Sequence, residues 1–304
     1  MNNHEPKLYD LVNTQDPDSM YGEIRDILKL FNTKSLPDEF EVVYQDTVRL
    51  FQGTYPGYRA SNTKYHNLEH TAMVTLATAR LIHGCAGNGM LFQPDNIFTA
   101  LTASLFHDAG LIQTDQEQEG TGARHTIGHE DRSAMFTQEY LYTKNYSKKI
   151  IADCAHMIIC TDLEQDVGEI PFRSKEIETL GKIVGSSDLL AQIADRHYLE
   201  KLLLLFKEFK EAGMSGFDSE EQLLYKTEGF YKNVARKRLT EDFDNLAANM
   251  RYHFKEKWNI DRDLYQETIE NNIKYLKAIC RKNFNREDIK LFRHLRRGGI
   301  VSIS

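Results

Sequence analysis

Apolar residues recur three and four positions apart along almost the whole chain, which is the spacing of one face of an α-helix. Three clear examples lie in the N-terminal third, at residues 20–31, 40–51 and 70–83. No stretch shows the strict alternation of a half-buried strand. The pattern therefore predicts an all-α protein.

Residues 94–111 form a segment that is apolar almost all round. Pro94 suits the first turn of a helix and Gly110 suits its end. A helix without a polar face belongs in the centre of a domain. We therefore expect His107 and Asp108 at the C-terminal end of a buried helix.

The rest of the chain continues in the same way. A polar loop at 112–124 precedes two expected helices at 128–144 and 147–163, and 174–213 is expected to form two long helices with a break near Gly185. More amphipathic helices follow from 218 to 282. The pattern predicts one all-helical domain with an N-terminal extension (1–60), a core (61–213) and a C-terminal extension (214–304).

Composition narrows the functional classes. The 304 residues carry a formal net charge of -7, which argues against non-specific binding of nucleic acid. The four cysteines form no CxxC pair and indicate free thiols in a reducing compartment. No apolar stretch approaches the roughly 18 residues of a membrane span, so we expect a cytoplasmic protein without a membrane partner.

Polar residues interrupt the apolar helices at six positions. Burying a lone imidazole or carboxylate costs several kcal/mol unless it is paired or bound to a metal. Imidazole nitrogen and carboxylate oxygen together suit zinc, manganese or iron, and one aspartate can bridge two ions. We predict as metal ligands His70, His107, Asp108, His129, His156 and Asp188, with Asp108 as the bridge.

The order His70, His107-Asp108 and Asp188 resembles that of the HD-domain superfamily of metal-dependent phosphohydrolases. "YHNLEHT" resembles the "YHNxxHA" motif of cyclic nucleotide phosphodiesterases, and "HMIICTDL" resembles their "ATDM" segment. The segment 185–213 resembles the region around their last metal-binding aspartate, including its "EF". The resemblance implies an HD-type helical bundle in which His70 binds metal and His66 donates a proton.

The sequence departs from the phosphodiesterases after Asp108, where it reads "AGLIQTDQ" and lacks their next histidine. His129 and His156 occur instead, at positions similar to those of two further histidines in the diiron HD oxygenases. The resemblance thus implies two divalent metal ions. Each would be iron, manganese or zinc, and magnesium is another option. One ion would bind His70, His107, Asp108 and Asp188, and the other would bind Asp108, His129 and His156.

The function that we expect is hydrolysis of a phosphodiester, such as a cyclic nucleotide, by a metal-activated water. His66 and Asp108 are the expected catalytic residues, and Lys64, Arg124 and His125 are candidate contacts to a small phosphorylated substrate. Two alternatives remain, a diiron HD oxygenase acting on a small polar substrate and an HD scaffold that binds without turnover. The helical extensions could cover the site or form a homodimer.

Overall fold

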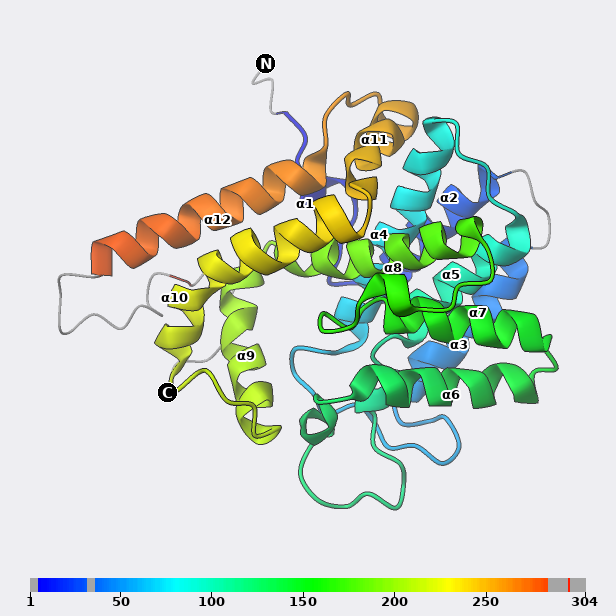
Figure 1. Ribbon diagram of the computed structural model, residues 1–304, viewed down its shortest axis with the longest axis horizontal. Coiled ribbons are helices and arrows are strands. Elements are labelled where there is room, and N and C mark those ends of the chain that lie inside the picture. The colour runs from blue at the N-terminus through cyan, green and yellow to red at the C-terminus, as the bar shows by residue number, and fades with distance from the viewer. Residues whose placement is uncertain (1–4, 32–35, 284–294, 296–304) are drawn as a thin grey trace.

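The computed structural model describes residues 5–31, 36–283 and 295, and within them the fold is all-α (Figure 1). These residues contain no β-strand, only an isolated antiparallel bridge between Tyr58 and Thr114. The fold class predicted from the apolar spacing is confirmed. Parts of both expected extensions lie outside the described residues, at 1–4, 32–35, 284–294 and 296–304.

The first eight helices form a bundle around two central members. The central helices are α4 (Leu68–Gly87) and α5 (Pro94–Phe106), and every residue of α5 from 97 to 106 is buried. Around them lie α1 (Leu8–Leu11), α2 (Pro17–Lys29), α3 (Leu36–Phe51), α6 (His129–Thr143), α7 (Lys148–Ile159) and α8 (Lys175–Ile193). Short 3-10 turns interrupt the connections at Ala109–Leu111 (η1), Gly122–His125 (η2) and Val167–Glu169 (η3). The expected burial of this helix is confirmed, and His107 and Asp108 directly follow its last residue, Phe106; the expected end at Gly110 was wrong, because Gly110 lies in η1.

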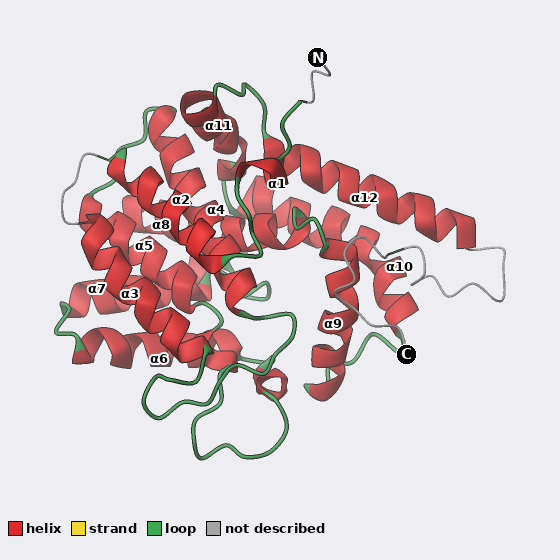
Figure 2. Ribbon diagram, turned by 180° about the vertical axis from the view of Figure 1, so that it is seen from behind, coloured by secondary structure: helices red, strands yellow, loops and turns green. Residues whose placement is uncertain are grey.

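The C-terminal helices divide between the bundle and a projecting group. α9 (Tyr198–Glu211), α10 (Glu220–Phe230) and α12 (Leu264–Asn283) extend to one side of the molecule, as both views show (Figures 1 and 2). α11 (Met250–Trp258) packs against α4. Two π-helical turns, Tyr231–Ala235 (η4) and Arg238–Asp242 (η5), and the 3-10 turn Leu246–Asn249 (η6) join α10 to α11.

The expected helix break near Gly185 was wrong, because α8 is continuous there and the break lies between its end at Ile193 and the start of α9 at Tyr198. Gly185 serves a close approach instead. A Cβ atom on it would lie 2.6 Å from the carbonyl oxygen of Cys160. The missing side chain lets α8 pack tightly against the end of α7.

None of the described helices is long and apolar enough to cross a membrane. The division of the chain into a core and two extensions remains a prediction.

Candidate metal centre

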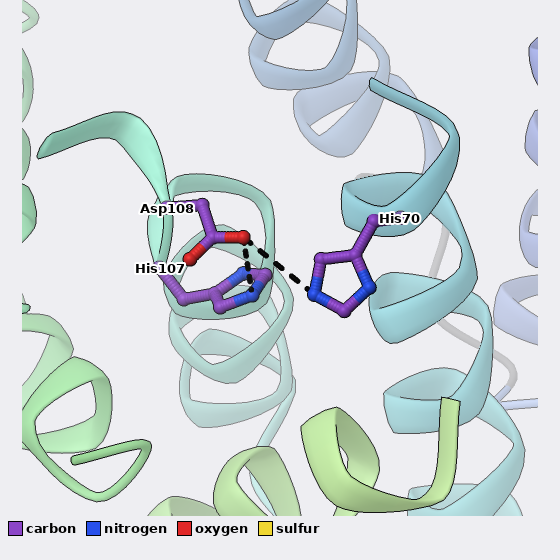
Figure 3. A group of neighbouring side chains, drawn as sticks. All are labelled: His70, His107 and Asp108. Atoms are coloured by element: carbon purple, nitrogen blue, oxygen red, sulfur yellow. Dashed lines mark ion pairs between the residues drawn. The ribbon is translucent and has the colours of Figure 1, made fainter. Parts of the chain in front are cut away.

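Three side chains form the centre of the site: His70 from the first turn of α4, and His107 and Asp108 from the end of α5. All three are buried and point toward one another (Figure 3). Asp108 Oδ2 lies 3.2 Å from His107 Nε2 and 3.5 Å from His70 Nε2. One ligand atom from each residue lies within 4.8 Å of the others, which is close enough for a shared ion.

Two further predicted ligands join this group. Asp188, in the middle of α8, places Oδ1 3.3 Å from His70 Nε2 and 3.7 Å from His107 Nε2. His129, the first residue of α6, places Nε2 3.3 Å from the other oxygen of Asp108, Oδ1. The two oxygens of Asp108 therefore face different sets of imidazoles.

His156 stands apart from the other five predicted ligands. It lies in the last turn of α7, its Nδ1 is buried without a hydrogen-bond partner, and its ring centroid lies 6.3 Å from that of Phe172. Among the described residues, no ion pair joins it to the cluster. Its assignment as a ligand of a second ion remains a prediction.

Asn67 determines how "YHNLEHT" folds. Its side chain accepts a hydrogen bond from His70 N at 3.0 Å, so Asn67 is the N-cap and α4 begins at Leu68. His66 therefore lies before the cap and outside α4, whereas His70 lies in its first turn. The two rings still approach each other, with centroids 5.8 Å apart.

Gly110 allows α6 to approach the end of α5. A Cβ atom at this position would lie 2.2 Å from the carbonyl oxygen of His129. The backbone of Gly110 also donates to Ser133 Oγ at 2.8 Å and accepts from Arg132 Nε at 2.9 Å. The small size of Gly110 thus lets His129 lie close to Asp108. The interpretation of Gly110 as a helix end did not indicate this role.

Backbone carbonyls orient two of the imidazoles. His107 Nδ1 lies 2.8 Å from the carbonyl oxygen of Ser104, and His129 Nδ1 lies 2.8 Å from that of Thr126. Because a carbonyl can only accept, each Nδ1 must donate, which leaves Nε2 facing Asp108. This is the arrangement found around metal-binding histidines. Glu130 Oε2 lies 3.1 Å from His129 Nδ1 and is an additional partner of that imidazole.

The charges of the cluster also fit a cation. Burial alone would lower the pKa values of His107 and His129, but Asp108 outweighs it and raises both to about 9. Burial would raise the pKa of Asp108, but the neighbouring imidazoles hold it well below its usual range. His107 Nε2 and Asp108 Oδ2 are buried without a hydrogen-bond partner. A divalent ion between these atoms would neutralise the carboxylate and displace the imidazole protons.

Glu208, on α9, was missed as a site residue. Its Oε2 lies 2.6 Å from His66 Nδ1, and its Oε1 accepts from the backbone N–H groups of Lys64 at 2.7 Å and Tyr65 at 2.6 Å. Burial would lower the pKa of His66, but Asp108 and Glu208 together raise it. The only sequence signal was the "EF" of the resembling segment, which is Glu208-Phe209.

Two of the three candidate substrate contacts, His125 and Arg124, have local partners for their side chains. His125 Nε2 lies 3.0 Å from Glu117 Oε1 in the preceding loop, and burial lowers the pKa of His125. The Arg124 side chain is exposed and donates to the carbonyl oxygen of Glu119 at 3.3 Å. The Lys64 side chain is exposed two residues before His66. Their roles toward a substrate remain predictions.

The fold and the cluster define the class of protein: an all-α protein with a buried histidine and aspartate group able to hold a metal ion. A comparison with protein families matches residues 55–267 to the family described as Npun_R2479-like. The chain belongs to this family, and the matched region contains the whole cluster and Glu208. No curated protein in the comparison matches the chain.

Proposed function

We propose that the protein is a metal-dependent phosphohydrolase of the HD-domain type, acting on a phosphodiester such as a cyclic nucleotide. The observation that carries the proposal is that a buried cluster able to hold a metal ion lies beside His66, a histidine that is bound by Glu208 and is not part of the cluster. His66 lies beside the cluster, its ring centroid 6.0 Å from that of His129, and is held by Glu208. The HD-like order of His70, His107-Asp108 and Asp188 supports the same assignment.

The cluster would hold the metal through His70, His107, Asp108 and Asp188, with His129 on the second oxygen of Asp108. Bound divalent metal would supply charge neutralisation for the phosphoryl oxygens and a water of lowered pKa.

His66 would provide the proton that the leaving group needs. Its Nδ1–H is engaged by Glu208, so the proton available to a substrate is the one on Nε2. The hydrogen bond to Glu208 favours the charged imidazolium of His66, which is the form required of a general acid. In hydrolysis, water would lose a proton to the solvent as its oxygen bonds to phosphorus, the bond from phosphorus to the leaving oxygen would break, and that oxygen would take a proton from His66.

A diiron HD oxygenase acting on a small polar substrate is the second candidate. The position of His129 on the far oxygen of Asp108 favours it, because a bridging aspartate and a further histidine are what a second metal needs. A mixed-valent iron signal in electron paramagnetic resonance, with consumption of O₂, would support this candidate over the hydrolase.

The test uses the full chain reconstituted with Mn²⁺ or Fe²⁺ in the absence of oxygen. It is assayed against a panel of cyclic nucleotides and simple phosphodiesters, beside Asp108→Ala. We expect metal-dependent hydrolysis that is lost in the variant. Full activity in Asp108→Ala, or no turnover by protein shown to be fully metallated, would contradict the hydrolase assignment.

A further inference from the structure

The outer face of α6 carries exposed apolar side chains. Met135 and Tyr142 are 68% and 72% exposed, and Ile127, two residues before the helix, is 68% exposed. Of the large apolar side chains in the described residues, only Leu91 is more exposed than these three. Single exposed apolar residues are normal on a protein surface, but three along one helix indicate a surface that contacts another protein.

The exposed positions of α6 have the spacing of a helix-packing seam. Four of them recur at intervals of four, three and four residues, at 131, 135, 138 and 142. This is the heptad spacing of helices that pack side by side. The seam forms one wall of an open groove of about 490 Å³, and α7 forms the other wall with Ile151 and Ala152. Side chains of another helix therefore have room between α6 and α7.

The two ends of this surface carry opposite charges. The lysine end consists of Lys148 and Lys149, which are exposed at the start of α7 beside the end of α6. The acidic end consists of Asp131, in the first turn of α6, and Glu164, in the loop after α7, and both are exposed. Within the part of the chain that the structure describes, none of these four side chains forms an ion pair. Their charges are therefore available to another molecule.

We propose that the protein forms a homodimer in which α6 packs antiparallel to the partner's α6, about a two-fold axis near Gln138. In this arrangement the lysine end of each copy meets the acidic end of the other, because a two-fold interface brings each contact twice. Met135 lies opposite the partner's Tyr142, and a methionine sulfur beside an aromatic ring is a favourable contact. Glu139 lies opposite the partner's Gln138, whose amide donates to the carboxylate. The surface is thus complementary to itself in both charge and register.

The dimer surface lies away from the projecting group. α6 and α7 are at the end of the molecule opposite to α12, as both views show (Figures 1 and 2). A dimer through α6 is therefore different from one formed by the C-terminal extension. It also does not rest on the proposed hydrolysis, because none of the paired residues belongs to the metal cluster.

The first test is sedimentation velocity of the full chain at protein concentrations from about 1 to 200 µM, which cover weak and moderately stable dimers. We expect a reversible equilibrium between monomer and dimer. Met135→Glu should raise the dissociation constant at least about tenfold, because it places a charge in the apolar centre of the contact. Leu91→Glu is the matched control, since Leu91 is 88% exposed and lies between α4 and α5, and it should leave the equilibrium unchanged. A monomer at every concentration, which would leave the groove to a different protein, or equal weakening by both variants would overturn the proposal.

Exchange of two charges tests whether the lysine end meets the acidic end. Asp131→Lys and Lys148→Glu should each weaken the dimer, because each places like charges opposite one another. The double variant exchanges the two charges and should restore the dissociation constant of the wild type. Weakening in both single variants that the double variant does not reverse would contradict the antiparallel arrangement.

A cysteine at the axis tests the register. A disulfide needs two Cα atoms within about 7 Å, so Gln138→Cys should give a disulfide-linked dimer under mild oxidation. Leu91→Cys, at an equally accessible position away from α6, should not. The wild type provides the background, since Cys280 is partly exposed and the other three cysteines are buried. Equal yields from the two variants would show random collision and would overturn the proposed axis.

Discussion

His66 Nδ1 and Glu208 Oε2 lie 2.6 Å apart although 142 positions separate them in the sequence. The other oxygen of Glu208 accepts hydrogen bonds from the backbone N–H groups of Lys64 and Tyr65, which directly precede His66. Glu208 therefore holds both the ring of His66 and the backbone that carries it. This places α9, a helix of the projecting group, in contact with the candidate site.

Glu208→Gln should lower the pKa of His66. The variant removes a carboxylate charge from a hydrogen bond that favours the imidazolium, while an amide oxygen can still cap the backbone. We expect a decrease of about 1 pH unit, measured by following the His66 ring resonances through a pH titration. If the protein is a hydrolase, the arm of the pH–rate profile that reports the general acid should move by the same amount.

Glu211→Gln is the matched control, because Glu211 lies one turn further along α9 and bonds to Thr121 instead of a histidine. Its His66 titration should equal that of the wild type. An unchanged His66 pKa in Glu208→Gln would show that Glu208 has only a structural role.

Asp108→Asn should abolish metal binding. Asp108 faces His70, His107 and His129, so every arrangement of ligands in the cluster depends on its charge. We expect metal affinity to fall by at least about a hundredfold, measured by calorimetric titration with Mn²⁺ and by metal analysis of the purified protein. Asp131→Asn is the control, since Asp131 is exposed in the first turn of α6. Equal metal content in both variants would contradict the site.

Metal affinity should increase with pH. The pKa values of His107 and His129 are raised to about 9, so near pH 7 in the metal-free protein both imidazoles are positively charged and carry a second proton, on Nε2. A ligand must lose its proton before it binds, so the dissociation constant for Mn²⁺ should fall by about tenfold or more per pH unit between pH 6 and pH 8. Calorimetry in buffers of different ionisation enthalpy counts the protons released. A constant affinity over this range would show that the histidines are not ligands.

Much of the fold was predictable because its signal is local. Apolar spacing marks helix faces, and five of the six residues predicted as ligands, which the structure brings together, stand out in the sequence as costly polar residues among apolar ones. Glu208 was not recognisable, since "FKEFKE" reads as the solvated face of an amphipathic helix. Its partner, His66, lies on a distant segment. Nothing near Glu208 in the sequence indicates that α9 packs against residues 64–66, which precede α4.

Glycine was the least predictable residue, because a helix break and a close approach of two backbones both favour it. Gly185 was interpreted as a break and is a close approach. Gly110 was interpreted as a helix end and also makes a close approach, to α6. Only the tertiary arrangement separates these meanings, so the way His129 reaches Asp108 could not be derived from the sequence.

Gly110→Ala should destabilise the protein and disturb His129. The new methyl group would overlap the carbonyl oxygen of His129, and α6 would have to move away from Asp108. We expect a loss of about 1–3 kcal/mol in the free energy of urea unfolding. Gly22→Ala is the control, because Gly22 lies inside α2 with no heavy atom within 4 Å of the added carbon, and it should gain about 0.5–1 kcal/mol. Equal effects of the two substitutions would contradict the packing argument.

Asp263 should make the protein less stable as pH rises through its folded pKa. Asp263 directly precedes α12 and accepts a hydrogen bond from Gln266 N at 3.0 Å. Burial, with Glu267 and Glu270 adding to it, raises the Asp263 pKa from 3.8 to about 6. A raised pKa means that the folded state binds the proton more tightly than the unfolded state. The stabilising contribution is therefore complete below about pH 4 and is lost as pH rises through about 6.

Asp263→Asn should remove this dependence while keeping an acceptor for the Gln266 N–H. Relative to the wild type, the variant should gain stability progressively from pH 4 to pH 6 and then hold a constant advantage of at most about 2–3 kcal/mol, measured by urea unfolding. Asp261→Asn should show the opposite trend, because Arg251 lowers the pKa of Asp261 and the wild type then gains from ionisation. A difference between Asp263→Asn and wild type that does not change with pH would show that the Asp263 carboxyl titrates alike in the folded and unfolded chain.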